Sequence, residues 1–241
     1  MVIPSLALAQ RLPQTIIPSH YSLYLDPLIS QKIFTGYETI DVRVSTATRE
    51  IVLNSLDLDI NEVEVKAGGS NQKANVTYDK PQEMARLSLP VPVPAGEAQI
   101  HLKFSGKLTE GLRGLYLSKG ARRQYAVTQF EGTYARMMFP CFDEPAFKAT
   151  FDLTVMADKS DTAISNGKIA KDESASGNRH KITFSTSPKM STYLVALAIG
   201  DWQCLSRTVD GVPIRVCAEP DKKQFGSFAL DVAAHSLQFY N

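Results

Sequence analysis

Short runs in which apolar and polar residues alternate constrain the fold of this chain more than any other feature. Between residues 21 and 104, isoleucine, leucine, valine and phenylalanine recur at every second position within each run. Successive side chains of a β-strand point to opposite faces of a sheet, so each run predicts a strand with one buried and one solvated face. The clearest runs are residues 40–44, 58–60, 63–65 and 100–104.

Turn-forming residues separate these runs. Residues 68–71 read Gly-Gly-Ser-Asn, and residues 90–96 are rich in proline, so we expect chain reversals at both places. Further strand patterns occur at residues 151–155, 163–165, 180–184 and 193–199. The sequence therefore predicts an all-β fold, a large antiparallel domain of several sheets with a sandwich-like or saddle-like architecture.

The last part of the chain changes to helical spacing. Apolar and small side chains recur three or four residues apart between Phe225 and Phe239, and Asp221 is the expected N-cap with Gln224 three residues later. No glycine or proline stop signal precedes Asn241. We therefore expect a short C-terminal helix that is cut off by the end of the chain.

Composition excludes some classes of partner. The 241 residues include 26 basic and 25 acidic side chains, so no excess of positive charge favours nucleic acid or an anionic membrane surface. No apolar run approaches the roughly 18–20 residues that a membrane-spanning helix needs. We expect no nucleic-acid partner and no membrane span, and a hydrophobic fraction of 44% is ample for a packed core.

The amino terminus bears on localisation. Residues 5–10 resemble the end of a secretory signal, with Ala7 and Ala9 as a small-residue cleavage pair. The residues before them contain no basic segment and too short an apolar core for a complete signal. We expect an exported protein, periplasmic or secreted, that retains a signal remnant at residues 1–10; the alternative is a cytoplasmic protein with a disordered leader.

Three cysteines permit at most one disulfide, and the spacing of two of them suggests where it forms. Asp210 and Gly211 predict a two-residue hairpin turn, because glycine tolerates the positive φ that such a turn requires. Pairing outward from this turn sets Cys204 opposite Cys217 at a non-hydrogen-bonded site, where the Cα separation of about 4.5 Å suits a disulfide. The alternative is a pair of reduced thiols on one face of the hairpin.

We find no motif for catalysis or metal binding. There is no H-E-x-x-H sequence, no G-x-S-x-G sequence and no phosphate-binding glycine loop. Cys141 has no histidine near it in the sequence, so we expect a buried structural thiol. The histidines are scattered and are expected to be structural: His20, His101, His180 and His235. We therefore predict no catalytic residue and no metal ligand in this chain.

The irregular segment at residues 128–145 is the best candidate for a binding site, because polar segments between regular strands often carry function. Gln129 and Glu131 lie two positions apart, so their side chains point to the same face of an extended segment. A carboxylate beside an amide oxygen can bind a protonated primary amine such as a peptide's amino terminus. The alternative is a solvated polar loop.

The sequence QFEGTYARMMFPCFDEPAFKATF, which starts at Gln129, closely resembles the signature block in the N-terminal domain of the M1 family of zinc aminopeptidases. Residues 18–27, 111–116 and 190–196 resemble the same domain, so the resemblance covers the chain from about residue 11. It implies that Glu131 anchors the substrate's amino group and that Gln129 helps to line the first side-chain pocket. Relatives often carry proline at the position of Gly132.

The resemblance also implies the role of the neighbouring residues. We expect Arg136, Asp143 and Glu144 to brace the loop through ion pairs. It further implies three parts: the leader at residues 1–10, the N-terminal β domain at 11–220, and at 221–241 the start of a helix that leads into a catalytic domain.

In this interpretation the parent is a zinc enzyme that removes N-terminal amino acids from peptides, with the catalytic domain as intramolecular partner. The G-x-M-E-N and H-E-x-x-H motifs of the family are absent, so we expect the 241-residue chain to be inactive alone and to hold no cofactor. The alternative function is a stand-alone, non-catalytic β-sandwich binding module.

Overall fold

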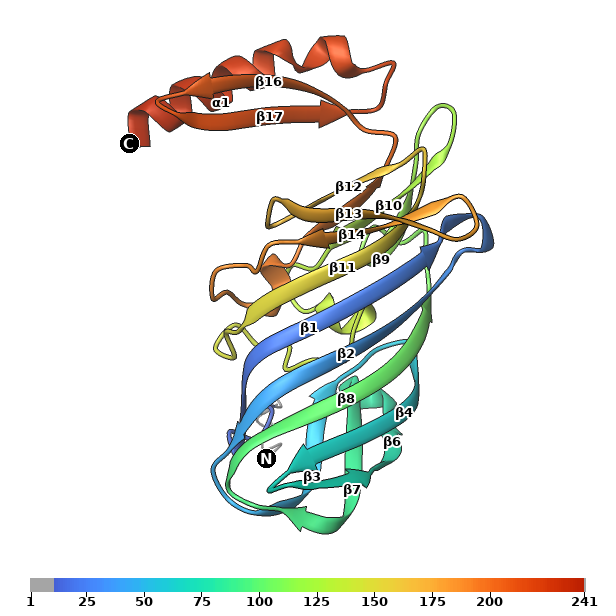
Figure 1. The fold of residues 1–241 in the computed structure, drawn as a ribbon, viewed down its shortest axis with the longest axis vertical. Coiled ribbons are helices and arrows are strands. Elements are labelled where there is room, and N and C mark those ends of the chain that lie inside the picture. The colour runs from blue at the N-terminus through green and yellow to red at the C-terminus, as the bar shows by residue number, and fades with distance from the viewer. Residues whose placement is uncertain (1–10, 241) are drawn as a thin grey trace, which may run out of the picture.

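The computed structural model describes residues 11–240, so the leader predicted at residues 1–10 lies outside the described part. A long mixed sheet of eight strands dominates the molecule, in the order β13-β14-β11-β1-β2-β8-β4-β5 (Figure 1). Its strands are β1 (Ile16–Leu28), β2 (Ile33–Val44), β4 (Leu58–Ala67), β5 (Ser70–Lys73), β8 (Gly96–Lys107), β11 (Thr150–Asp158), β13 (Ile169–Ala175) and β14 (Arg179–Phe184).

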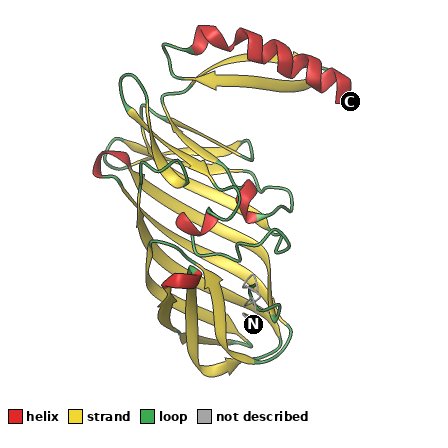
Figure 2. Cartoon of the chain, turned by 180° about the vertical axis from the view of Figure 1, so that it is seen from behind, coloured by secondary structure: helices red, strands yellow, loops and turns green. Residues whose placement is uncertain are grey.

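Three smaller sheets complete the β structure. They are a three-stranded sheet of β3 (Thr48–Asn54), β7 (Met84–Val93) and β6 (Asn75–Asp79), a four-stranded sheet of β12 (Thr162–Ser165), β15 (Leu197–Gly200), β10 (Gln124–Gln129) and β9 (Gly114–Lys119), and a hairpin of β16 (Gln203–Val209) and β17 (Val212–Ala218). Viewed from behind, short helical turns lie among the loops in front of the long sheet (Figure 2). The all-β prediction is confirmed.

One pair of strands departs from the expected antiparallel arrangement. Within residues 11–240, every strand pair is antiparallel except β1 with β11, which run parallel with Tyr21 opposite Phe151. Parallel neighbours need a long connection between them. In the sequence, this connection includes all strands of the three-stranded sheet and two strands of the four-stranded sheet, β9 and β10. β1 thereby joins the first part of the domain to the second.

The two alternating runs at residues 58–60 and 63–65 form a single strand, β4, with an irregularity between Ile60 and Glu62. An extra residue in one strand shifts the alternation by one position. Ile60 and Val63 are therefore both buried, at 9% and 3% exposure, although their sequence positions differ by an odd number. The bulge explains why the apolar pattern changes phase.

The structure corrects one strand prediction and one turn prediction. The run at residues 193–199 is a strand only from Leu197, because the short helical turn η4 (Thr192–Leu194) occupies its beginning. The proline-rich run at residues 90–96 is not wholly a turn, since β7 extends through Val93. Proline is tolerated here because its missing N–H costs no ladder bond: between Ser88 and Val93 no residue of β7 pairs with β3 or β6.

The C-terminal hairpin has the predicted register. Asp210 and Gly211 form its turn with φ values of 48° and 79°, and Cys204 lies opposite Cys217. The structure joins these two cysteines by a disulfide, with Cα atoms 4.0 Å apart. The hairpin lies with helix α1 (Ser227–Tyr240) at one end of the molecule (Figure 1).

Helix α1 packs on β16 and β17 and carries large apolar side chains on its exposed side as well. Leu230 and Ala234 are buried against the hairpin, whereas Phe228 and Phe239 are 77% and 81% exposed. The predicted N-cap at Asp221 is wrong, because the short turn η5 (Lys223–Gly226) precedes the helix. Among the described residues, no helix has both the length and the apolar character required to cross a membrane.

Candidate functional site: an exposed carboxylate at the end of β10

The predicted amine-binding residues lie together on the surface. Gln129 is the last residue of β10 and Glu131 follows it in a turn, where the backbone N–H of Tyr134 donates to the carbonyl oxygen of Phe130 at 3.0 Å. Both candidate side chains are exposed, and Phe130 between them is buried. This exposed–buried–exposed order agrees with the prediction that the side chains of Gln129 and Glu131 share one face, although strand β10 ends at Gln129.

The two candidate residues are linked by a hydrogen bond. The side-chain oxygen Oε1 of Gln129 accepts a hydrogen bond of 3.0 Å from the backbone N–H of Glu131. Within residues 11–240, the carboxylate of Glu131 makes no hydrogen bond or ion pair of its own. A Cβ placed on the neighbouring Gly132 would find no atom within 4 Å, so this turn is open to solvent. The carboxylate is therefore free to accept a ligand.

An aromatic cluster holds the turn against the long sheet. The cluster consists of Tyr21, Phe130, Phe139 and Phe151, all buried. Tyr21 stacks on Phe151 with ring centroids 4.8 Å apart, and Phe139 lies edge-on to Tyr21 at 5.9 Å. Phe130 contacts Phe139 with a centroid distance of 6.4 Å. Since such contacts add to the burial of large rings, the residue between Gln129 and Glu131 is fixed in the core.

A buried ion pair braces the segment behind the turn. Arg136 Nε donates to Asp143 Oδ2 at 3.0 Å, and both side chains are almost fully buried. Asp143 Oδ1 accepts a hydrogen bond of 2.6 Å from the hydroxyl of Thr192. The backbone N–H of Asp143 donates to Asn54 Oδ1 at 3.1 Å. The predicted bracing by Arg136 and Asp143 is confirmed.

Sequence reasoning missed several partners of this brace. Arg136 Nη1 also donates to Glu83 Oε2 at 2.9 Å, a residue that lies far away in the sequence. No local pattern could have identified Glu83, Asn54 or Thr192. Glu144 differs from the prediction, because its carboxylate accepts a hydrogen bond from the backbone N–H of Leu12 and forms no ion pair with any of the residues 11–240.

Two buried titratable groups lie near the aromatic cluster. Cys141 is fully buried, and burial followed by the charge of Asp143 raises the pKa of its thiol well above the usual value. A thiol that resists ionisation is a poor nucleophile, which supports the structural role expected for Cys141. Burial also raises the pKa of the Glu38 carboxyl, and neither of its oxygens has a hydrogen-bond partner among the described residues.

The zinc implied by the family resemblance does not fit the described residues. In residues 11–240, no three side chains of histidine, cysteine, aspartate or glutamate are grouped so that they could hold a metal ion. The histidines make separate contacts: His20 with Thr150, His101 with Thr39, His180 with Asp172 and His235 with the carbonyl oxygen of Asp231. We therefore assign no metal-dependent step to this part of the chain.

Together the fold and the site define a class of protein: a multi-sheet β domain that presents an unpaired carboxylate beside a glutamine at the end of a strand. Comparison with known families is more specific. The model of the peptidase M1 N-terminal domain matches residues 17–194, so the chain belongs to this family. The predicted resemblance is thereby confirmed.

Curated relatives match almost the whole chain. It is 39% identical to a puromycin-sensitive aminopeptidase of Caenorhabditis elegans, with 96% of the chain and 25% of the relative covered. It is 35% identical to an aminopeptidase N of Acetobacter pasteurianus, with 97% and 66% covered, and 36% identical to the human endoplasmic reticulum aminopeptidase 1, with 95% and 26% covered. The chain spans about a quarter of the length of the first of these relatives.

Proposed function

We propose that this chain is the substrate-positioning domain of a zinc-dependent aminopeptidase, and that Glu131 and Gln129 bind the free amino group of the peptide. The observation that carries this proposal is the exposed carboxylate of Glu131, which has no ion pair or hydrogen bond among residues 11–240, in the segment that matches the family. Gln129 fixes the backbone N–H of Glu131, and Phe130 between them is buried. The relatives' names describe aminopeptidases, which supports the same class of substrate.

The chemistry of the site suits an α-amino group. This group has an ordinary pKa of about 7.7–8.0, so most of it is charged at neutral pH. A charge-assisted hydrogen bond to a carboxylate contributes roughly 1.5–3 kcal/mol. Only the first residue of a peptide carries this amine, so binding it at Glu131 fixes the peptide in a single register. An enzyme with such a site removes residues from the amino terminus and does not cut internal bonds.

The role of the described residues is binding and orientation. Zinc in the parent enzyme would supply a Lewis acid and an activated water. Glu131 and Gln129 would hold the amino end, so that the first peptide bond is placed consistently, and correct placement alone can account for a large part of a rate enhancement. We expect the 241-residue chain by itself to bind peptides weakly and to have no peptidase activity.

The proposal is tested by Glu131→Gln in the full-length enzyme. Removing the charge should raise KM for aminoacyl substrates by about 10- to 100-fold, which corresponds to the energy of one charge-assisted hydrogen bond. Zinc content should remain unchanged. Glu97→Gln, an exposed site on β8, serves as the control. Kinetic constants equal to those of the unmodified enzyme would refute the assignment of Glu131.

The alternative is a stand-alone binding module without hydrolysis. In that case Glu131→Gln would weaken peptide binding to this chain, and neither the variant nor the unmodified protein would hydrolyse peptides. The coding sequence after Asn241 separates the two functions. G-x-M-E-N followed by H-E-x-x-H supports the enzyme, and a stop codon supports the module.

A further inference from the structure

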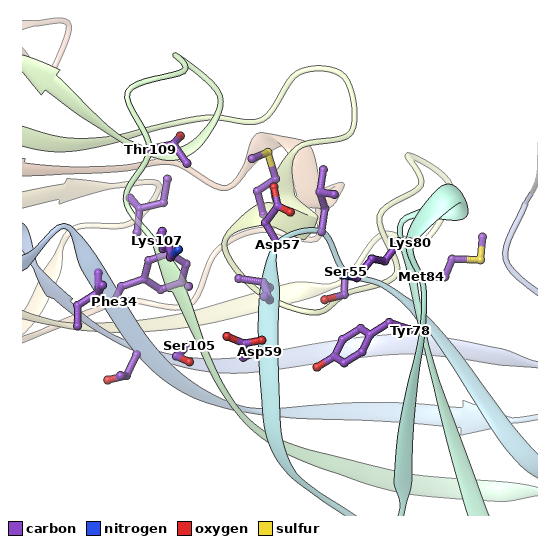
Figure 3. Close-up of a pocket in the computed structure, with 17 residues that line it drawn as sticks. Phe34, Ser55, Asp57, Asp59, Tyr78, Lys80, Met84, Ser105, Lys107 and Thr109 are labelled. Atoms are coloured by element: carbon purple, nitrogen blue, oxygen red, sulfur yellow. The ribbon is translucent and has the colours of Figure 1, made fainter.

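An open cavity lies where three sheets meet, and one of its lining residues, Leu115, pairs with Thr128 near the end of β10. It has a volume of about 780 Å³ and is lined by β2, β4 and β8 of the long sheet, by β6 and β7 of the three-stranded sheet, and by β9 and the turn η3 (Ala135–Met137) (Figure 3). We call it the three-sheet groove. Its volume falls within the roughly 300–1,000 Å³ typical of ligand pockets. Neither Gln129 nor Glu131 lines it.

The groove runs beside strand edges that have no strand partner. β6 is an edge strand, since it pairs only with β7 within residues 11–240. In β4, the residues Leu58–Ile60 pair with β8 on one side, whereas β5 covers the other side only from Glu64 onward. The N–H of Ile60 points into this uncovered side and donates to the hydroxyl of Tyr78 at 2.7 Å.

Unpaired strand edges favour one kind of ligand. An extended peptide can hydrogen-bond to the free main-chain groups of an edge, which is a recurring mode of peptide recognition. The base of the groove is apolar: Met137 is partly exposed there, and behind it Leu58, Met84 and Leu115 are buried. Apolar side chains of a peptide would pack on this base.

The charges at the groove suit a peptide with free ends. Asp57, Asp59, Lys80 and Lys107 all line the groove and are exposed. None of these four forms an ion pair with another described residue, although ion pairs are common elsewhere on the surface. In the view of Figure 3, the two carboxylates lie between Lys107 and Lys80. A short peptide carries an ammonium group at one end and a carboxylate at the other, so it complements both signs.

We propose that the three-sheet groove is a second peptide-binding site, which takes a short extended peptide with free amino and carboxyl ends. The ammonium group lies at Asp57 and Asp59, the carboxylate lies at Lys107 or Lys80, and the main chain lies along the edge of β4 at Leu58, next to Ile60, whose N–H is occupied by the hydroxyl of Tyr78. The groove shares no lining residue with the amine anchor at Gln129 and Glu131 and does not depend on the function proposed for that anchor.

Titration of the isotope-labelled 241-residue chain with the tetrapeptide Leu-Ala-Leu-Ala, followed by NMR, tests the proposal. We expect amide shifts at Leu58–Ile60 and at Tyr78. The same peptide with an acetylated amino end and an amidated carboxyl end should bind about 10-fold more weakly, because both charged contacts are lost. Asp59→Asn and Lys107→Gln should each weaken binding several-fold, while Lys171→Gln on the distant strand β13 should not.

The outcomes distinguish this site from the amine anchor. Shifts confined to residues 129–132 would show that peptides bind only at Glu131, and would overturn the second site while supporting the first. An absence of shifts, or an affinity that neither Asp59→Asn nor Lys107→Gln changes, would also overturn it. Both altered side chains are exposed, so folding should be retained, and circular dichroism verifies this. Groove shifts that persist in Glu131→Gln would establish two independent sites.

Discussion

The side-chain oxygen of Gln129 accepts a hydrogen bond of 3.0 Å from the backbone N–H of Glu131, so one candidate residue fixes the backbone that presents the other. The two positions therefore act together. Gln129 can shape the site even where its own side chain does not contact a ligand, because the turn at Glu131 depends on its oxygen.

We predict that Gln129→Ala weakens peptide binding at Glu131 with little effect on global stability. A single exposed hydrogen bond contributes about 0.5–1.5 kcal/mol, which corresponds to an affinity loss of up to about 10-fold. NMR titration of the chain measures the affinity, and the amide signal of Glu131 should shift in the free protein. Gln224→Ala, which removes a hydrogen bond to the carbonyl oxygen of Asp221 near the C-terminus, is the matched control. Equal affinities in Gln129→Ala and the unmodified chain would contradict the prediction.

We predict that Asp143→Asn strongly destabilises the domain. The substitution leaves the guanidinium of Arg136 buried without its main counter-charge, and breaking a buried ion pair from one side costs about 3–5 kcal/mol. Urea denaturation measures the free energy of unfolding. Lys181→Gln, which removes an exposed pair with Glu173, should give no measurable change. A loss for Asp143→Asn as small as that of the control would show that Arg136 finds compensation elsewhere.

We predict that the buried carboxyl of Glu38 makes the domain less stable as pH rises. Burial raises its pKa in the folded state above the ordinary 4.5, so the folded protein keeps a proton that the unfolded chain releases. Its contribution to stability is complete below pH 4.5 and is lost as pH rises through the folded-state pKa. Tyr21 and Cys141 face the same region, and the pKa of each is also raised, chiefly by burial, so they titrate at higher pH.

Glu38→Gln tests this pH dependence. The variant has no proton to lose, so its free energy of unfolding should vary less with pH than that of the unmodified chain. It should also be the more stable of the two at alkaline pH. Urea denaturation at a series of pH values provides the comparison. Parallel profiles for the two proteins would refute a buried, protonated Glu38.

We predict that Cys204 and Cys217 are oxidised and that Cys141 alone is a free thiol. Alkylation of the denatured chain without reductant should then add a single adduct by intact mass, and prior reduction should raise the number to three, the cysteine content of the chain. The physical reason is the register of the hairpin, which sets the two residues directly opposite each other. Three adducts without reductant would exclude the bridge.

Local signals explain which parts of the fold were predictable. The Asp210-Gly211 turn determines the hairpin register, because a two-residue loop leaves only one pairing of the strands. Alternation identified strands elsewhere, such as those at residues 40–44 and 100–104, because it too depends only on neighbours in the sequence. The start of the run at residues 193–199 was mistaken for strand, since a short apolar stretch does not reveal its own backbone conformation.

Contacts between distant segments could not be read from the sequence. The parallel pairing of β1 with β11 and the bond from Arg136 to Glu83 depend on tertiary packing, and neither has a local pattern. In the candidate site, Gln129 and Glu131 were identified by their spacing and by the family resemblance. Their mutual hydrogen bond was not, because an extended segment would separate the side chain of one from the backbone of the other.

The pairing of β1 with β11 also has a consequence for how the chain folds during synthesis. β1 can pair with β2 soon after both leave the ribosome, but its other edge remains open until β11 has been made much later. An open strand edge invites pairing with other chains, and contacts between distant residues slow folding. The long sheet is therefore completed late, and the nascent domain should need protection from aggregation until Phe151 reaches Tyr21.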